Sequence, residues 1–220
     1  MQTIFSDLVL TQITLYRIKL NWQAAFDTSL KRVRLIIGTM LIVAIINIMP
    51  SFFKAIEQRH GVILHDWVLA NLPAADLSIP IFAIIWGMGI LMVIRTLYKP
   101  DLGITYLWTL IFVCIARFIT LTLVNLDPPA GLVPLVDPLT SYFYGHAAIT
   151  KDLFFSGHTS TLVLIYLNLD RKSDKRIALA ATIVLMFLLL IQHIHYTMDV
   201  LAAPVIVYCC YRFTKALGFK

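Results

Sequence analysis

One segment in the last third of the chain could bind and protonate a phosphate. Lys151–Thr159, with the sequence KDLFFSGHT, places Ser156, Gly157 and His158 at the start of an apolar run. A helix that begins there presents free backbone N–H groups to an anion, so a phosphate could sit against it. Asp152, just outside the predicted helix, is expected to cap it or to orient a neighbouring group rather than to carry a proton.

A second segment supplies a partner for His158. His193–Val200, with the sequence HIHYTMDV, places His195 and Asp199 four residues apart and therefore on one face of a helix. There the carboxylate can orient the imidazole and stabilise its cationic form, which makes His195 a candidate nucleophile or base. His193 is two residues away and points elsewhere on a helix, so we expect it at an interface or behind the site.

These residues, together with Arg117, suit phosphoryl transfer through a phosphohistidine. Arg117 is the one charge inside another apolar run, and an ionisable group at that depth indicates function. His195 would attack phosphorus in line while His158 protonates the departing oxygen. Arg117 and the N–H groups near Gly157 would neutralise the charge that grows on the remaining oxygens. No metal-ligand pattern is present, so we expect neither a metal nor another cofactor.

The elements that position these residues must lie in a membrane. Of the 220 residues, 60% are hydrophobic and 14% are charged, and the mean hydropathy is +0.84. This leaves too few polar side chains to cover the surface of a soluble protein. The net charge of +6 resides in short clusters between apolar runs, so we assign it to membrane topology and expect no nucleic-acid partner.

The sequence predicts an all-α, polytopic membrane protein with one catalytic domain. Residues 1–34 mix basic and apolar side chains and are predicted to form a cytoplasmic amphipathic helix. Residues 35–215 form the six-span domain, and 216–220 form a cytoplasmic tail. The predicted spans cover residues 35–53, 77–97, 102–126, 153–169, 177–193 and 196–214.

The distribution of basic residues predicts the orientation. With the N-terminus inside, most of the 18 Lys and Arg residues fall on the cytoplasmic side, while only Lys54, Arg59 and Lys151 fall outside. Both termini are then cytoplasmic, and His158 and Asp199 lie near the periplasmic, extracellular or lumenal face. Arg117 reaches a similar depth from its own span, so the three predict one pocket.

The motifs resemble those of the sphingomyelin synthase family, a branch of the type 2 phosphatidic acid phosphatase superfamily. Residues 151–160 and 193–200 are similar to the family motifs C-G-D-x-x-x-S-G-H-T and H-Y-T-x-D-V. Arg117–Thr120 and Leu126–Pro129 resemble its R-x-I-T and downstream Leu-x-x-Pro. Leu72–Ser78 resembles its Pro-rich segment more weakly. Thr150 and Lys151 depart from the pattern, since they replace Cys-Gly.

The resemblance implies a lipid phosphotransferase with His158, His195 and Asp199 as its catalytic triad. Such enzymes move a phospho-headgroup (phosphocholine, phosphoethanolamine or phosphoinositol) from a glycerophospholipid donor to a ceramide acceptor and release diacylglycerol. Membrane lipids would be its partners, and a homodimer is left open. We expect the following residues at the substrate: Arg117, Lys151, Asp152, Ser156, Gly157 and Tyr196.

Two alternatives stay open. A lipid phosphate phosphatase or phospholipase C-like hydrolase would use the same triad. However, hydrolytic members carry an Arg six residues before the last His, where this chain has Leu189, and the Lys-x6-Arg-Pro motif is absent. A singly charged phosphodiester therefore matches the few cations better than a dianionic monoester. A transporter with a His/Asp proton relay is the other alternative, although no inverted repeat is evident.

Overall fold

The computed structural model describes residues 2–135 and 149–219, with side chains from residue 14 onward, and in these residues the chain is all-α with eight helices. The predicted loop Asp127–Thr150 lies partly outside them. The helices are α1 (Gln2–Asp27), α2 (Ser29–Glu57), α3 (Trp67–Ala70), α4 (Ser78–Tyr98), α5 (Pro100–Leu123), α7 (Gly157–Asn168), α8 (Lys172–Ile191) and α9 (Thr197–Ala216).

Three of the described helices, α2, α4 and α5, are long and apolar enough to cross a membrane, so the chain is an integral membrane protein. The other three predicted spans do not meet both criteria. At 12 residues α7 is ~18 Å long, well short of the ~30 Å hydrocarbon core. α8 and α9 have sufficient length, but they include more polar or charged residues, such as those in the first turn of α8.

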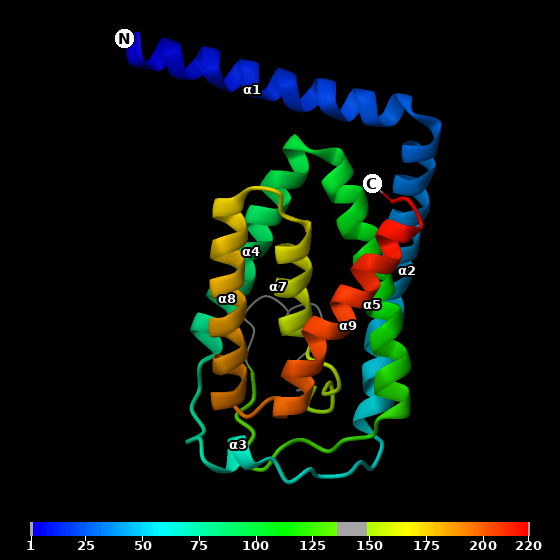
Figure 1. Cartoon of the computed structure of the whole chain (residues 1–220), viewed down its shortest axis with the longest axis vertical. Coiled ribbons are helices and arrows are strands. Elements are labelled where there is room, and N and C mark those ends of the chain that lie inside the picture. The colour runs from blue at the N-terminus through cyan, green and yellow to red at the C-terminus, as the bar shows by residue number, and fades with distance from the viewer. Residues whose placement is uncertain (1, 136–148, 220) are drawn as a thin grey trace.

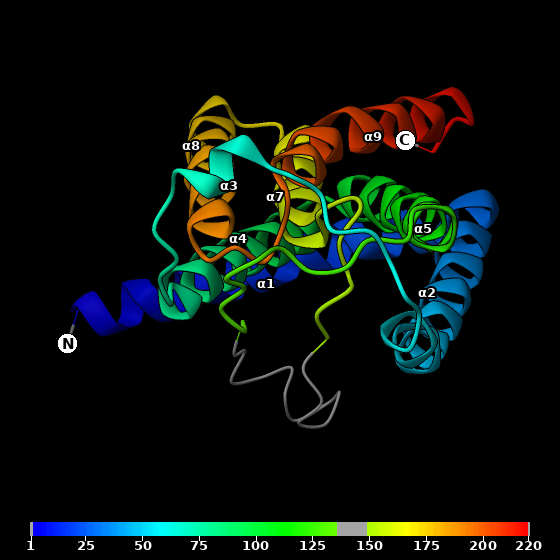
Figure 2. The ribbon, with the colours of Figure 1, turned by 90° about the horizontal axis from the view of Figure 1, so that it is seen from below.

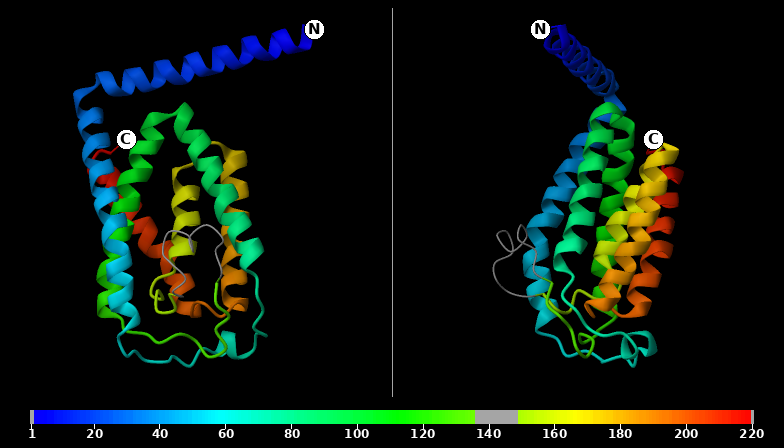
Figure 3. Two further views of the ribbon diagram at one scale, coloured as in Figure 1. Left: turned by 180° about the vertical axis from the view of Figure 1, so that it is seen from behind. Right: turned by 90° about the vertical axis from the view of Figure 1, so that its left-hand side faces the viewer.

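The short helix α7 lies at the centre of the bundle and packs against α4, α5, α8 and α9, while α2 packs on the outer side of α5 (Figure 1). Successive helices from α2 to α9, apart from the single turn of α3, run in alternating directions. α1 lies across one end of the bundle, and the connections that include α3 lie at the other (Figures 1 and 3). Seen from that second end, α7 is enclosed by its neighbours (Figure 2).

Apolar packing on two sides of α7 explains its central position. Leu162 and Ile165 contact buried residues of α4 and α8, including Ile81 and Leu185. Val163 and Leu164 belong to a second cluster with residues of α5 and α9. Because its surroundings are protein rather than lipid, α7 does not need the length of a lipid-exposed span.

Within the predicted fourth span, residues 153–169, the helix begins only at Gly157, and residues 151–156 are not helical. Their backbone groups are held by side chains from α5 instead: the Arg117 guanidinium donates to the Phe155 carbonyl, and the Thr120 hydroxyl donates to the Phe154 carbonyl over 3.1 Å. Irregular backbone at membrane depth is stable only where the protein satisfies it in this way.

The boundary between the N-terminal segment and the first span also differs from the prediction. The helix breaks at Thr28 rather than Arg34, and α2 continues past Phe53 to Glu57. α1 is tied to the bundle by Asn21 and Trp22, which donate hydrogen bonds of 2.9 and 3.0 Å to the last carbonyls of α4. These bonds satisfy acceptors that the end of α4 leaves open.

The ion pair between Arg95 of α4 and Asp174 of α8 gives a test of this packing. Its two contacts are 2.6 and 3.2 Å long, and the Asp174 side chain is only 7% exposed. We expect Asp174→Asn to lower the melting temperature in detergent by several degrees, since it leaves the guanidinium without its charged partner. Asp170→Asn is the matched control. The 2.8 Å contact of Asp170 with Lys99 is largely exposed and should matter little. Equal shifts would contradict this prediction.

Candidate active site

The two predicted histidines face each other at the end of the bundle opposite α1. The rings of His158, in the first turn of α7, and His195, just before α9, have centroids 6.3 Å apart. His195 is buried, whereas His158 is partly exposed. The two rings meet edge to face, so both imidazoles are close enough to act on one group bound beside them.

Asp199 lies on the Nδ1 side of His195. Its Oδ2 atom is 3.5 Å from Nδ1, which is longer than a normal hydrogen bond, and the carboxylate is fully buried. Among the described residues, neither His195 Nδ1 nor Asp199 Oδ1 has a hydrogen-bond partner. A small rotation of the imidazole would close the contact, as often happens when a catalytic site binds its substrate. Nε2 is then the atom left to meet phosphorus.

The two motifs are joined directly through Asp199. Its Oδ2 accepts a 2.9 Å bond from the Tyr196 amide, and its carbonyl accepts a 3.1 Å bond from the Ser156 amide. Asp199 therefore holds both the start of α9 and Ser156, the last residue before α7, in position. Ser156 is the N-cap of α7, since its hydroxyl accepts from the Thr159 amide over 3.4 Å, so the interpretation of Asp152 as the cap is wrong.

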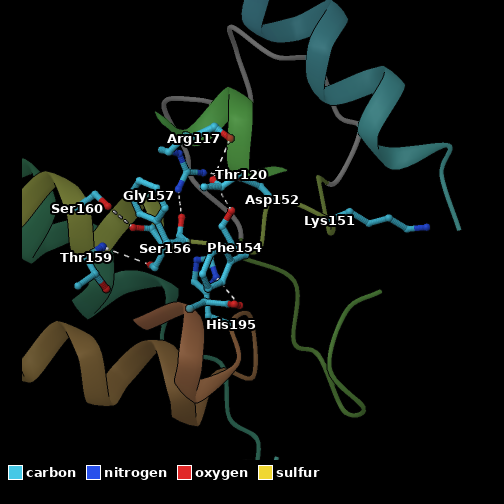
Figure 4. A network of polar contacts seen from close by, with 12 residues as sticks. Arg117, Thr120, Lys151, Asp152, Phe154, Ser156, Gly157, Thr159, Ser160 and His195 are labelled. Atoms are coloured by element: carbon cyan, nitrogen blue, oxygen red, sulfur yellow. Dashed lines mark hydrogen bonds and ion pairs between the residues drawn. The ribbon is translucent and has the colours of Figure 1, made fainter. Parts of the chain in front are cut away.

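Arg117 lies behind the turn that precedes α7. Its buried guanidinium donates to the Asp152 carboxylate and to the Phe155 carbonyl, and it lies over the Phe155 ring at 5.6 Å (Figure 4). Asp152 is thus the orienting group that the sequence allowed. The donors of the guanidinium are directed at protein acceptors, so the substrate role of Arg117 stays a prediction, in which it would act on a phosphate by its charge beneath the turn.

Gly157 is required by this arrangement. A Cβ atom built there would lie 3.0 to 3.2 Å from the Arg117 guanidinium. The absence of a side chain lets the guanidinium approach the first residue of α7 from behind. Its positive charge then adds to the partial positive charge of the helix N-terminus, which favours an anion in front of His158.

Lys151 extends away from His195 (Figure 4). Its ammonium lies 2.7 Å from the Asp127 carboxylate and also donates to the Arg59 carbonyl. The hydrogen bond from Lys151 lowers the pKa of Asp127. A substrate would have to open this pair to reach the ammonium, and the substrate role of Lys151 stays a prediction.

Glu57 is a residue of this region that the sequence did not reveal. Located at the end of α2, its carboxylate accepts bonds from the amides of Thr150 and Lys151 over 3.0 and 3.1 Å. The segment before α7 is therefore held by α2 as well as α5. Neither motif spacing nor hydropathy could have found this contact, because it joins residues more than 90 positions apart.

Tyr196 and His193 connect the loops around the site. The Tyr196 hydroxyl donates to the Asp127 carbonyl over 2.9 Å and accepts from the Leu64 amide over 3.1 Å. The ring nitrogens of His193 lie 3.1 Å from the carbonyls of Ala130 and Leu72. His193 thus lies behind the site, as its spacing indicated. The tyrosine binds backbone in this structure, and its substrate role stays a prediction.

Two further residues also escaped the sequence analysis. Phe82 of α4 contacts His158 edge to face, with ring centroids 6.3 Å apart, and limits where that imidazole can move. Asp66 accepts bonds from the amide and hydroxyl of Thr197, the first residue of α9, over 2.6 and 3.0 Å. Phe82 lies in a long apolar run and Asp66 in a short polar connection, and neither stretch has a pattern from which these contacts could be inferred.

A cavity of about 640 Å³ lies at the α1 end of the bundle and not at the triad. The candidate active site is therefore assigned from its chemistry, namely two facing imidazoles, a buried carboxylate and a helix N-terminus, rather than from cavity size. Across the residues that the structure describes, no three His, Cys, Asp or Glu side chains gather in a way that could hold a metal ion.

Comparison with protein families agrees with this assignment. Residues 151–216 match the family model PAP2_C, described as PAP2 superfamily C-terminal, and the match includes both motifs and helices α7 to α9. Over these residues the chain is similar to the PAP2 superfamily, whose members are lipid phosphate phosphatases and phosphotransferases. No curated protein matches the chain significantly.

The position of Arg117 leads to a first prediction for the site. Arg117→Lys keeps the charge but cannot bridge Asp152 and the Phe155 carbonyl, so the turn before α7 should loosen. We expect the backbone amides of residues 152–159 to exchange hydrogen roughly tenfold faster. Arg59→Lys is the matched control, because Arg59 also donates to two carbonyls, those of Leu121 and Thr122. Unchanged exchange in Arg117→Lys would contradict the positioning role.

Asp66 leads to a prediction about pH. Burial acts to raise the pKa of Asp66, but hydrogen bonds from Thr197, Leu69 and Val68 outweigh it and hold the pKa below its usual value. The stability that Asp66 contributes is thus present above its unfolded pKa of about 3.9 and is lost as pH falls through the lower folded value. Between about pH 6 and about pH 3, the melting temperature of Asp66→Asn should fall less than that of the wild type. Asp27→Asn, at the end of α1, should behave like the wild type.

Proposed function

We propose that the chain is a sphingomyelin synthase-like phosphotransferase. It would move a phosphocholine or phosphoethanolamine headgroup from a glycerophospholipid to ceramide, or to a related lipid alcohol, and release diacylglycerol. The observation that carries the proposal is the pair of facing imidazoles 6.3 Å apart, one of which has Asp199 on its Nδ1 side. The PAP2 match over residues 151–216 and the motif resemblance support the same chemistry.

In the first half-reaction, Nε2 of His195 attacks phosphorus. A nitrogen–phosphorus bond forms, and the bond from phosphorus to the diacylglycerol oxygen breaks. His158 gives its proton to that oxygen as it departs. Asp199 holds the Nδ1 proton of His195 and stabilises the cationic ring of the phosphohistidine.

The second half-reaction reverses these roles. His158 takes the proton of the acceptor hydroxyl while the oxygen of that hydroxyl attacks phosphorus. The bond between phosphorus and Nε2 of His195 then breaks. The non-bridging oxygens face the N-terminus of α7, where backbone N–H groups and the Arg117 charge beneath Gly157 oppose their negative charge.

The pairing of the cations favours headgroup transfer over monoester hydrolysis. Arg117 already bonds Asp152 and a carbonyl, and Lys151 already bonds Asp127. A phosphodiester brings one negative charge to this site, whereas a terminal monoester brings nearly two and would need free cations. A lipid phosphate phosphatase or phospholipase C-like hydrolase is the second candidate. A proton-relay transporter finds no support in the family match.

The proposed topology has six spans with both termini in the cytoplasm. The alternating helix directions place α1 and the end of α9 together at one end of the bundle, and the triad at the other (Figure 1). α7 and the irregular segment before it would cross the membrane together, enclosed by the other helices. The site then opens to the periplasmic, extracellular or lumenal side.

Single substitutions test the catalytic roles. His195→Ala, His158→Ala and Asp199→Asn should each lower turnover by at least roughly 10² to 10⁴-fold, since each removes a nucleophile, an acid or its orienting partner. His60→Ala and His65→Ala are matched controls, because both histidines are exposed in the connection after α2. Unchanged melting temperatures would show that the variants fold. Retained activity in His195→Ala would refute the proposed nucleophile.

The reaction class needs a product assay with purified protein. Labelled ceramide and labelled diacylglycerol are offered separately, each with phosphatidylcholine, phosphatidylethanolamine or phosphatidylinositol as donor, and the products are resolved by chromatography. We expect a headgroup on ceramide when phosphatidylcholine or phosphatidylethanolamine is present. Free phosphoalcohol without lipid product would support the hydrolase instead. Turnover without an ion gradient would exclude the transporter.

A further inference from the structure

The cavity of about 640 Å³ lies at the end of the bundle opposite the triad. α1 covers it, and its walls come from the turn between α4 and α5 and from the ends of α7 and α9. His158 and Asn168 are at opposite ends of α7, so ~15 Å separates the triad end from the cavity end. Its lining includes Asn21, Lys31, Tyr98, Lys99, Tyr211 and Lys215.

The cavity lies at the level in the membrane where lipid headgroups are expected. Tyr98 and Pro100, which line it, are the last residue of α4 and the first residue of α5, two helices able to cross the membrane. The cavity therefore lies where hydrocarbon gives way to water. On the membrane side of it, Ile94 and Leu97 of α4 are 41% and 43% exposed, so apolar surface is at hand for an acyl chain.

The lining offers charges of both signs. The ammonium of Lys31 lies 2.6 Å from Asp101, and that of Lys99 lies 2.8 Å from Asp170. Both aspartates are more than half exposed, and such ion pairs are weak enough for a ligand to open. Lys215 has no carboxylate within ion-pair distance among the described residues. Its ammonium lies 5.5 Å from the centre of the Tyr211 ring.

We propose that this cavity binds the zwitterionic headgroup of a glycerophospholipid, phosphocholine or phosphoethanolamine. The phosphate would meet Lys215, and the ammonium would meet Asp101 and Asp170. Nearly balanced charges suit a zwitterion better than an anionic lipid, because the aspartates repel added negative charge. The site would lie in the leaflet opposite the triad, and its occupancy does not depend on the proposed reaction.

The test is photoaffinity labelling of the purified full chain in maltoside micelles. The probe is phosphatidylcholine with a photoreactive group close to its headgroup, and labelled peptides are identified by mass spectrometry. We expect labels in residues 94–102 and 208–216. Unlabelled phosphatidylcholine or phosphatidylethanolamine should compete about tenfold better than phosphatidylglycerol, the difference expected from one charge-assisted contact.

A matched pair of variants separates this site from others. Lys215→Gln should reduce labelling about tenfold, whereas Arg212→Gln should not. Arg212 lies one turn earlier on α9, contacts the Tyr208 hydroxyl over 3.0 Å and does not line the cavity. Labelling of these peptides should also persist in His195→Ala, which separates the cavity from the active site.

Three results would overturn the proposal. Equal labelling in Lys215→Gln and Arg212→Gln would show that the cavity does not hold the probe. Equal or better competition by phosphatidylglycerol would indicate an anion site instead. Competition by free glycerophosphocholine as strong as that by the lipid would assign the cavity to a water-soluble compound. Turnover is measured separately, so none of these results bears on the proposed reaction.

Discussion

The candidate active site depends on a buried guanidinium beneath a turn that is not helical. Residues 151–156 are partly buried among apolar helices, where protein groups must satisfy most of their carbonyls and amides. Arg117 and Thr120 of α5 donate hydrogen bonds to two of these carbonyls, and the carbonyl of Asp199 accepts one from the Ser156 amide. Without these bonds, the chain before α7 would lower its free energy by continuing the helix, and His158 would leave its position at the helix N-terminus.

The candidate catalytic groups therefore come from the ends of helices rather than from their middles. His158 is in the first turn of α7, and His195 directly precedes α9. Asp199 holds both segments through its side chain and its carbonyl. Asp66 and Tyr196 then fix the same end of α9 to the connection after α2. The distance between the two imidazoles therefore depends on several loops, and hydrogen bonds hold each of these loops to the helix bundle.

The partners of the lysine and arginine side chains differ between the two ends of the bundle. Near the triad, Arg117 and Lys151 are both bound to carboxylates, which leaves a site suited to a single negative charge. At the α1 end, two exposed ion pairs and one further lysine line a cavity with both signs of charge. The same residue types thus favour ligands of different charge at the two ends. Burial and ion-pair partners determine how strongly each charged side chain interacts with a ligand.

Much of this protein follows from its sequence alone. Apolar run lengths predicted the all-α membrane fold and located α2, α4 and α5, because hydropathy is a local property. Asp199 does lie near His195, but the prediction that they share a helix face is wrong, because His195 precedes α9 in a non-helical turn. The motifs also indicated the superfamily whose C-terminal family model matches residues 151–216. Only the tertiary structure decided where α7 begins, that Ser156 rather than Asp152 caps it, and that Lys151 turns toward Asp127. These outcomes depend on hydrogen bonds and ion pairs between residues far apart in the chain, and no local pattern encodes which partner a buried polar group will meet.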